Sequence, residues 1–286
     1  MIRPKDNISK VIENKKALKS KDVAHPVVKA ASFLSSWNSN NMSRIEALSK
    51  SKLLVSNEGW IGLVGRLAAA LDEIGVLIEC GVKVDSLHDY GVKLNNGKKV
   101  EADVVILACG LNGARKLLRD IYPNRVDEVL ANPSRTTASI IELGLTSKSL
   151  RGRHAIIDTE NNTAAIDYVA IQPRLSAHGS HISAITVGGL SGDVGETRFD
   201  SSEQRLQYLE NFLDSQAGGW RDHVVTELRQ EKITIHEYCE NEIDSFAFSD
   251  VGIILAGSWV KSDYILADAA VHSGRIAGQN IAKAQH

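Results

Sequence analysis

The sequence of 286 residues predicts a mixed α/β fold. Two separate segments have the pattern of a strand followed by a helix, and a region of strands and helices is inserted between them. Residues 104–108 form an all-apolar run, typical of a parallel strand covered on both faces, and glycines follow before a helical stretch. Residues 252–256 form a second apolar run that stops at Gly257, and a long helix is predicted over residues 267–284. Between these ends, several predicted strands are separated by clusters of Gly, Asn and Ser.

Composition and charge exclude several classes of protein. The chain is 43% hydrophobic and 24% charged with a net charge of −2, which is typical of a globular protein and does not indicate nucleic-acid binding. Residues 1–52 hold 11 basic and four acidic residues, a net charge of +7, so the remainder carries −9. This basic segment is either a solvated helical face or an arm that meets an anionic partner.

Cysteine usage and hydropathy indicate a cytoplasmic protein. The three cysteines are widely spaced without a CxxC pair, and no His/Cys/Asp cluster has ligand spacing, so neither a disulfide framework nor a metal site is predicted. No apolar run reaches the ~18–20 residues of a spanning helix, and the first 25 residues lack the apolar region of a secretory signal. Peripheral membrane contact stays open. A serine hydrolase is disfavoured because GxSxG is absent.

The elements of the first 101 residues follow from periodicity and turn signals. Three-to-four spacing of apolar residues predicts helices within residues 1–50, interrupted at Pro26, and a helix over residues 63–74. Asn96-Gly97 is a tight-turn signal between two predicted strands. Strands are expected at residues 52–55, 76–79, 82–87, 91–94 and 98–101, the third and fourth forming a hairpin.

The rest of the chain is read in the same way. An amphipathic helix is predicted at residues 202–215, where apolar residues share one face, and a second helix at residues 224–230. A short helix is expected at residues 114–119. Strands are expected at residues 139–145, 154–158, 165–173, 181–188 and 232–238.

The tail carries the clearest chemical signal. A strand that stops at glycine and leads into a helix presents first-turn amides, which lack intrahelical partners and lie at the positive end of the helix dipole. Such amides bind phosphate or an electron-rich ring oxygen, and Gly257 would allow the backbone to approach a ligand closely. Packing alone also explains such a segment, so both interpretations stay open.

Two segments together resemble a known family. They are GWIGLVGRLAAALDEIGVLIECGVKVDSLHDYGVKLNNGKKVEADVVILACG, residues 59–110, and GIILAGSWVKSDYILADAAVHSGRIAGQNI, residues 252–281. Both are similar to the flavoprotein superfamily of amine oxidases, protoporphyrinogen oxidase and phytoene/squalene desaturases. The resemblance implies a partial Rossmann-like FAD-binding domain with an inserted sheet-plus-helix substrate domain, and an FAD-dependent oxidoreductase that transfers hydride from a small or apolar substrate to flavin.

The resemblance also implies domain boundaries. Residues 1–57 would be a helical segment belonging to the substrate domain, and residues 58–112 part of the FAD-binding domain. Residues 113–250 would form the rest of the substrate domain, and residues 251–286 would return to the FAD-binding domain. The substrate is expected against residues 165–173 and 181–188.

By resemblance, three residues would contact the adenosine half of FAD. Val84 matches the valine whose backbone pairs with the adenine edge. Cys109 and Gly110 end the strand beside the adenosine. No catalytic residue is assigned, although the expected substrate region holds four candidates: His154, His178, His181 and Asp167.

Four more residues would contact the other half of the cofactor. Gly257 matches the glycine that lets the chain pass the ribityl–pyrophosphate, and Ser258 stands where the family has an acid. Ala267 and Asp268 would begin the helix whose amides face the pyrimidine end of the flavin. Ala269 replaces a glycine, a second departure from the family.

The largest departure is the GxGxxG motif, which binds the FAD pyrophosphate and which the sequence lacks. One hypothesis is that a separate chain supplies this unit, so that FAD is shared in a split enzyme. A second is a non-catalytic protein, derived from flavoproteins, that binds a ligand or partner without FAD. A third is a degenerate βαβ nucleotide site at residues 52–80 in an NAD- or SAM-dependent enzyme.

Overall fold

The computed structural model describes residues 56–88, 91–147, 150, 153–158, 160–193, 196–264 and 266–284. The predicted helices within residues 1–50 and the strand at 52–55 lie outside this part of the chain. The chain divides into two compact units. Unit 1 comprises Met1–Ile78 and Thr136–Ile235, and unit 2 comprises Glu79–Arg135 and His236–His286.

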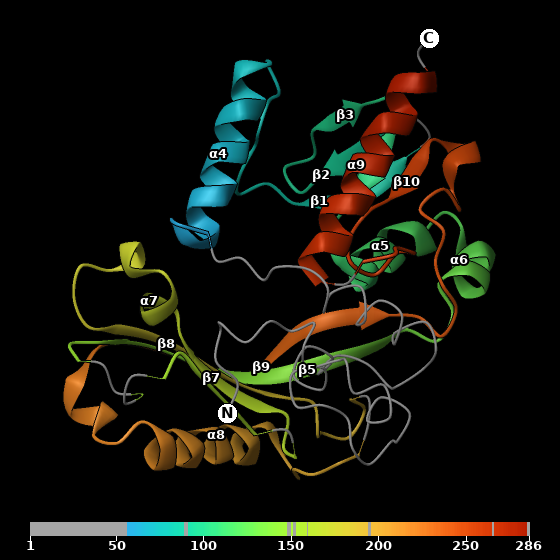
Figure 1. The fold of residues 1–286 in the computed structure, drawn as a ribbon. Coiled ribbons are helices and arrows are strands. Elements are labelled where there is room, and N and C mark those ends of the chain that lie inside the picture. The colour runs from blue at the N-terminus through green and yellow to red at the C-terminus, as the bar shows by residue number, and fades with distance from the viewer. Residues whose placement is uncertain are drawn as a thin grey trace. The chain divides into compact units, whose positions relative to one another are not determined.

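Unit 1 contains a five-stranded sheet with the strand order β6-β7-β8-β5-β9 (Figure 1). The pairs β6–β7, β7–β8 and β5–β8 are antiparallel. The strands are β5 (Ser134–Leu145), β6 (Ala155–Asp158), β7 (Thr163–Asp167), β8 (Ser180–Val187) and β9 (Val224–Tyr238), and the longer helices are α4 (Gly59–Glu73) and α8 (Ser202–Gln216).

Strand register sorts the side chains of unit 1 into two faces. The pairs Ile141↔Ala184 and Leu143↔Ile182 lie on one face. That face forms a core cluster with the buried leucines of α8, as the predicted amphipathic pattern requires. Helix α8 begins where Ser201 caps it, its side chain accepting the amide of Gln204. The predicted helix at residues 202–215 is confirmed.

The strand predicted at residues 165–173 is wrong beyond Asp167. The Asp167 carboxylate accepts the amides of Val169 and Ala170, each at 3.1 Å, which starts the short helix α7 (Tyr168–Ile171). A 3-10 turn, η2 (Pro173–Leu175), follows. This N-cap therefore ends the strand at Asp167, whereas the alternation of apolar and polar residues had predicted a longer strand.

The helix predicted at residues 224–230 is also wrong, because these residues form the first half of strand β9. The segment opens with Val224, Val225 and Thr226, whose branched side chains favour strands. Pairing with β5 in the sheet then overrides the weak helical periodicity. The strand predicted at residues 232–238 is confirmed as the second half of β9.

Unit 2 contains two small sheets. Strands β1, β2 and β3 form an antiparallel meander, and β10 pairs with β4 in parallel. The predicted hairpin and the turn at Asn96-Gly97 are confirmed, whereas residues 76–79 form no strand. The elements are β1 (Val84–His88), β2 (Gly91–Leu94), β3 (Lys99–Glu101), β4 (Val105–Leu107), β10 (Ile253–Leu255), α5 (Gly110–Arg119), α6 (Pro123–Val129), the 3-10 turns η3 (Trp220–His223, in unit 1) and η4 (Ser249–Val251), and α9 (Leu266–Ala284).

The core of unit 2 lies between the parallel strands and α5. Leu107 and Leu255, from the two strands, pack in one cluster with Leu111 and Leu118 of α5 and with Phe248. Sequence analysis predicted both strands and the helix, although α5 begins four residues earlier than expected. The fold class, mixed α/β, is confirmed.

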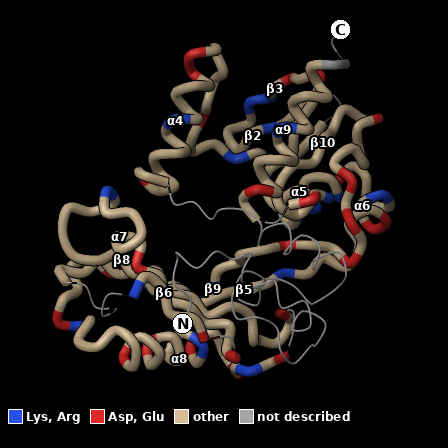
Figure 2. The backbone as a smooth tube through the Cα atoms, in the orientation of Figure 1, with Lys and Arg blue, Asp and Glu red and all other residues tan. Residues whose placement is uncertain are grey.

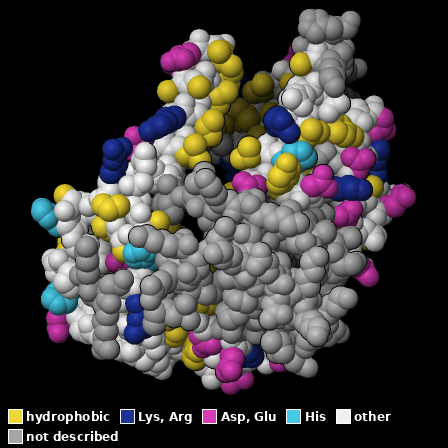
Figure 3. Space-filling model, viewed as in Figure 1, with side chains coloured by type: hydrophobic (Ala, Val, Ile, Leu, Met, Phe, Trp, Pro, Cys, Tyr) yellow, Lys and Arg dark blue, Asp and Glu magenta, His cyan; other side chains and the backbone are white. Residues whose placement is uncertain are grey.

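Helix α4 and the residues after it expose a long apolar stretch. No residue of α4 is buried. Eleven large apolar side chains between residues 60 and 82 are between 39% and 87% exposed. We call this stretch the apolar segment 60–82, and Figure 3 shows hydrophobic side chains gathered over α4. Its members are Trp60, Ile61, Leu63, Val64, Leu67, Leu71, Ile74, Val76, Leu77, Ile78 and Val82.

Acidic and basic residues both occur along α6 and α8 (Figure 2). None of the described helices is long and apolar enough to cross a bilayer.

Candidate functional site

The candidate site lies at the carboxyl edge of the parallel pair β4–β10. The strands pair in register from Val105↔Ile253 to Leu107↔Leu255, and Ala256 N donates to Leu107 O at 3.0 Å. Because parallel strands end at the same edge, residues 109–110 and 257–258 meet there. All seven predicted cofactor residues belong to unit 2, and four of them share this edge. Their cofactor roles stay predictions.

Gly257 joins this edge to helix α9. Its φ of 143° favours glycine, and its amide donates to Ser273 Oγ at 2.9 Å. Ser273 Oγ also lies 3.1 Å from Gly257 O. Ser273 is buried along with Ala269 and Ala277, one turn before and after it. The small residues predicted to allow close packing therefore bring α9 against the end of β10.

The indole of Trp259 lies beside Gly257. A Cβ added to Gly257 would stand 2.4 Å from Trp259 Nε1. This indole N–H is buried and has no hydrogen-bond acceptor within the described chain. A buried donor without an acceptor is unusual, and it marks a place where a ligand atom could accept a hydrogen bond.

The amino end of α5 already holds an anion of the protein. Leu111 N donates to Glu237 Oε2 at 2.8 Å, and Asn112 donates to the other carboxylate oxygen. The Glu237 carboxylate therefore satisfies the positive end of this helix dipole. Burial, with a contribution from Glu237, raises the pKa of Cys109, which keeps the thiol protonated near neutral pH. Sequence reasoning missed Glu237 because it lies 126 residues from Leu111 and no local signal marks it.

The remaining predicted residues are placed as follows. Val84 opens β1, pairs with Leu94 and packs half-buried against the core cluster of unit 2. Ser258 is half-buried after Gly257. Ala267 and Asp268 are exposed in the first turn of α9, so its first-turn amides lie near the surface.

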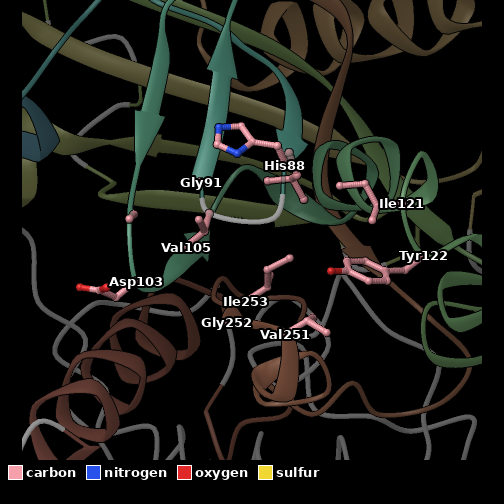
Figure 4. A pocket seen from close by; sticks show the side chains of 11 residues that line it. His88, Gly91, Asp103, Val105, Ile121, Tyr122, Val251, Gly252 and Ile253 are labelled. Atoms are coloured by element: carbon pink, nitrogen blue, oxygen red, sulfur yellow. The ribbon is translucent and has the colours of Figure 1, made fainter.

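The opposite, amino edge of the two strands offers no cofactor site. A cavity of ≈ 20 Å³ lies there, lined by residues that include His88, Tyr122 and Gly252 (Figure 4). This volume holds about one water molecule. The open hollow beside it is lined by the acids Glu101, Asp103 and Asp250, which disfavour a phosphate-bearing ligand.

The candidate residues of the middle region, all in unit 1, have separate environments. Asp167 caps α7 and accepts the hydroxyl of Ser180 at 2.8 Å, so its role is structural. His178 is exposed, and His154 Nδ1 is buried without a partner in the described structure. His181 Nε2 lies 3.0 Å from Glu142 Oε2. Among the described residues, no three His, Cys, Asp or Glu side chains are grouped to hold a metal ion.

Replacing Gly257 with alanine is expected to lower the free energy of unfolding by about 1–3 kcal/mol, because the left-handed φ and the Trp259 indole both oppose a Cβ. Thermal unfolding measures the change. The matched control is Gly274→Ala in α9, where a Cβ meets nothing within 4 Å and the helix gains propensity. Equal melting temperatures for the two variants would contradict the described conformation of Gly257.

Comparison with solved structures identifies the fold. An oxidoreductase from Methanosarcina mazei matches with a TM-score of 0.60 and 15% identity, over 84% of this chain and 59% of that chain. Cyclohexylamine oxidase from Brevibacterium oxydans matches with a TM-score of 0.52 and 16% identity, over 79% and 52%. A triple mutant of putrescine oxidase matches with a TM-score of 0.54 and 16% identity, over 79% and 53%.

The chain thus spans 52% to 59% of the length of these structures. No protein-family profile matches the sequence, and no curated protein does. The chain therefore shares its fold with part of each of these three structures, in agreement with the fold that its sequence resemblance implied.

Proposed function

We propose that this chain is one part of an FAD-dependent oxidoreductase that transfers hydride from a small or apolar substrate to flavin. A second polypeptide would supply the GxGxxG unit, and FAD would be shared between the two. The observation that carries this proposal is the carboxyl edge of β4–β10, where Gly110 and Gly257 follow the ends of two neighbouring parallel strands. Ligands of open α/β sheets bind at such an edge.

The donors at this edge suit the flavin better than the pyrophosphate. The amides of Leu111 and Gly257 are already bound by Glu237 and Ser273. The Trp259 N–H and the first turn of α9 remain as donors for carbonyl oxygens of a ring. Donors for the pyrophosphate would then come from the second polypeptide.

Strand β4 offers the place where a further strand can join. The outer edge of β10 is covered, since Ile253 N and Leu255 N donate to Phe248 O and Ser245 O. No strand in the described part of the chain pairs with the second edge of β4. A two-stranded parallel sheet of three-residue strands is marginal alone, because parallel sheets are normally larger and covered on both faces. We therefore place the partner's strand against β4.

The apolar segment 60–82 supports a macromolecular partner. Monomeric proteins rarely expose contiguous apolar patches above a few hundred Å², and larger patches mark interaction sites. The run Val76–Ile78 also reads as a buried strand in the sequence but has no strand partner among the described residues. The absence of a strand here removes support from the third hypothesis, a βαβ site at residues 52–80.

The chemistry divides between cofactor and protein. The flavin, when bound, would supply the hydride acceptor, and the protein would supply binding, orientation and the exclusion of water. Trp259 and α9 would hold and orient the ring. Adenine would lie by Val84, as the resemblance implies.

Co-expression with a GxGxxG protein from a neighbouring gene is expected to give a yellow complex with absorbance near ~450 nm, the signature of bound flavin. The control is the same partner with both motif glycines that line the pyrophosphate replaced by valine. A colourless complex with the unaltered partner would reject the split flavoenzyme.

A non-catalytic ligand- or partner-binding protein is the second candidate. It is favoured by the carboxylate of Glu237 at the α5 amino end and by Ser258 at the family's acidic position. This candidate predicts a stable but colourless complex, whereas the first predicts a coloured one.

A further inference from the structure

The outer face of the unit 1 sheet holds a polar cluster. Register places Glu142 opposite Ser183, and Gly144 opposite His181, on the face that turns away from α8. The pair Ile140↔Ile185 precedes them on the same face. Ile166, on the neighbouring strand β7, pairs with Ser183. All these residues are half-buried. A charged pair therefore stands among isoleucines.

Glu142 accepts two hydrogen bonds within this cluster. Its Oε2 lies 3.0 Å from His181 Nε2, and its Oε1 accepts the hydroxyl of Ser183 at 2.6 Å. Because a carboxylate only accepts, the imidazole is the donor. Each carboxylate oxygen therefore holds one hydrogen bond of the cluster.

Within the described part of the chain, Glu142 is the one hydrogen-bond partner of the His181 ring. The hydrogen bond to Glu142 raises the pKa of His181, and the charges of Glu142 and Asp167 add to that effect against desolvation. The protonated ring has a second N–H at Nδ1, and 45% of the side chain is exposed. The Tyr168 ring lies beside it, with ring centroids 5.7 Å apart.

The position across from His181 has no bulky side chain. Gly144 lies opposite, and a Cβ there would stand 2.5 Å from the hydroxyl of Thr226 on β9. His181 thus has the Tyr168 ring beside it and a glycine opposite it. Among the described residues, Glu142 and Tyr168 contact the ring, and the charge of Asp167 acts on it from the next strand.

We infer that His181, held by Glu142 and flanked by Tyr168, binds a small molecule that joins a flat apolar body to a carboxylate or other acidic oxygen. The imidazolium N–H supplies a charge-assisted hydrogen bond to that oxygen. Tyr168 and the isoleucines contact the apolar body. Glu142 acts as a positioning residue. The inference names a ligand for the sheet on which the substrate is expected, and it requires unit 1 but not FAD.

The test titrates benzoate into the full chain at pH 6 and follows the His181 ring by NMR. Benzoate is expected to shift the His181 signals, and benzylamine is not. His181→Gln should weaken benzoate binding about tenfold or more, the effect of losing a hydrogen bond to a charged group. The matched control is His178→Gln, an exposed histidine of the same unit, which should bind as the unaltered chain does.

A second variant guards against misfolding. Glu142→Gln keeps a hydrogen-bond acceptor for Ser183 but should lower the His181 pKa toward its usual value of about 6.5, and benzoate affinity at pH 7 should fall with it. Benzylamine binding more tightly than benzoate, or His181→Gln leaving benzoate affinity unchanged, would overturn the inference. Because none of these readouts uses flavin, they are independent of whether the complex is coloured.

Discussion

Replacing Arg205 with methionine is expected to lower the free energy of unfolding by about 3–5 kcal/mol, because a buried carboxylate loses its counter-charge. Arg205 is fully buried on α8, and the Asp193 side chain is 3% exposed. The guanidinium donates to Asp193 at 3.2 Å, to Gly188 O at 2.9 Å and to Ser139 Oγ at 2.8 Å. One side chain therefore joins the helix to β5 and to the loop after β8.

Urea unfolding followed by circular dichroism measures this effect. The control is Arg221→Met, which breaks the pair with Asp214, where both side chains are about half exposed. Exposed ion pairs contribute only about 0–1 kcal/mol. If the two variants lost the same stability, the buried network would not be the support of unit 1 that its geometry indicates.

Replacing Ile106 with proline is expected to abolish assembly with the GxGxxG partner while leaving the isolated chain folded. Val105 N donates to Gly252 O, and Ala256 N donates to Leu107 O, so these neighbours of Ile106 face β10. The N–H of Ile106 therefore faces the second edge of β4. Proline removes that donor and is tolerated at a strand edge. The hydrogen bond that is lost is therefore the one to the partner's strand, and no bond within the described part of this chain is broken.

Co-purification and absorbance of the complex measure the outcome, and thermal unfolding of the isolated variant checks its fold. The control is Ile106→Ala, which shortens the half-exposed side chain but retains the N–H. Assembly should survive in the alanine variant and fail in the proline variant. Equal loss in both would show that the side chain, rather than the backbone edge, contacts the partner.

Elements with strong local signals were predictable from the sequence. The apolar runs that became β4 and β10 and the amphipathic α8 depend on periodicity and burial, which a single segment contains. The first half of strand β9 was not predictable, because it has weak helical periodicity and only pairing with β5 makes it a strand. The end of β7 depended on an N-cap by Asp167.

The candidate site was predicted in part. The resemblance implied that Gly110 and Gly257 contact FAD, which stays a prediction, and the parallel register brings both residues to one edge. It did not identify Glu237, whose bond to Leu111 joins residues far apart in the chain. Nor did it pair His181 with Glu142, because that contact depends on the register of β5 against β8. Contacts that depend on strand register can be identified only once the pairing of the strands in the sheet is known.

The apolar segment 60–82 also has a consequence for the steady-state amount of this protein in a cell. Exposed apolar surface makes a chain prone to aggregation, and cells remove such chains through chaperones and proteases. If the proposed partner covers this segment, a copy without it would be short-lived, and the steady-state amount of this chain would follow the amount of that partner rather than its own rate of synthesis. A pulse-chase measurement with and without the partner would show the difference as a change in half-life.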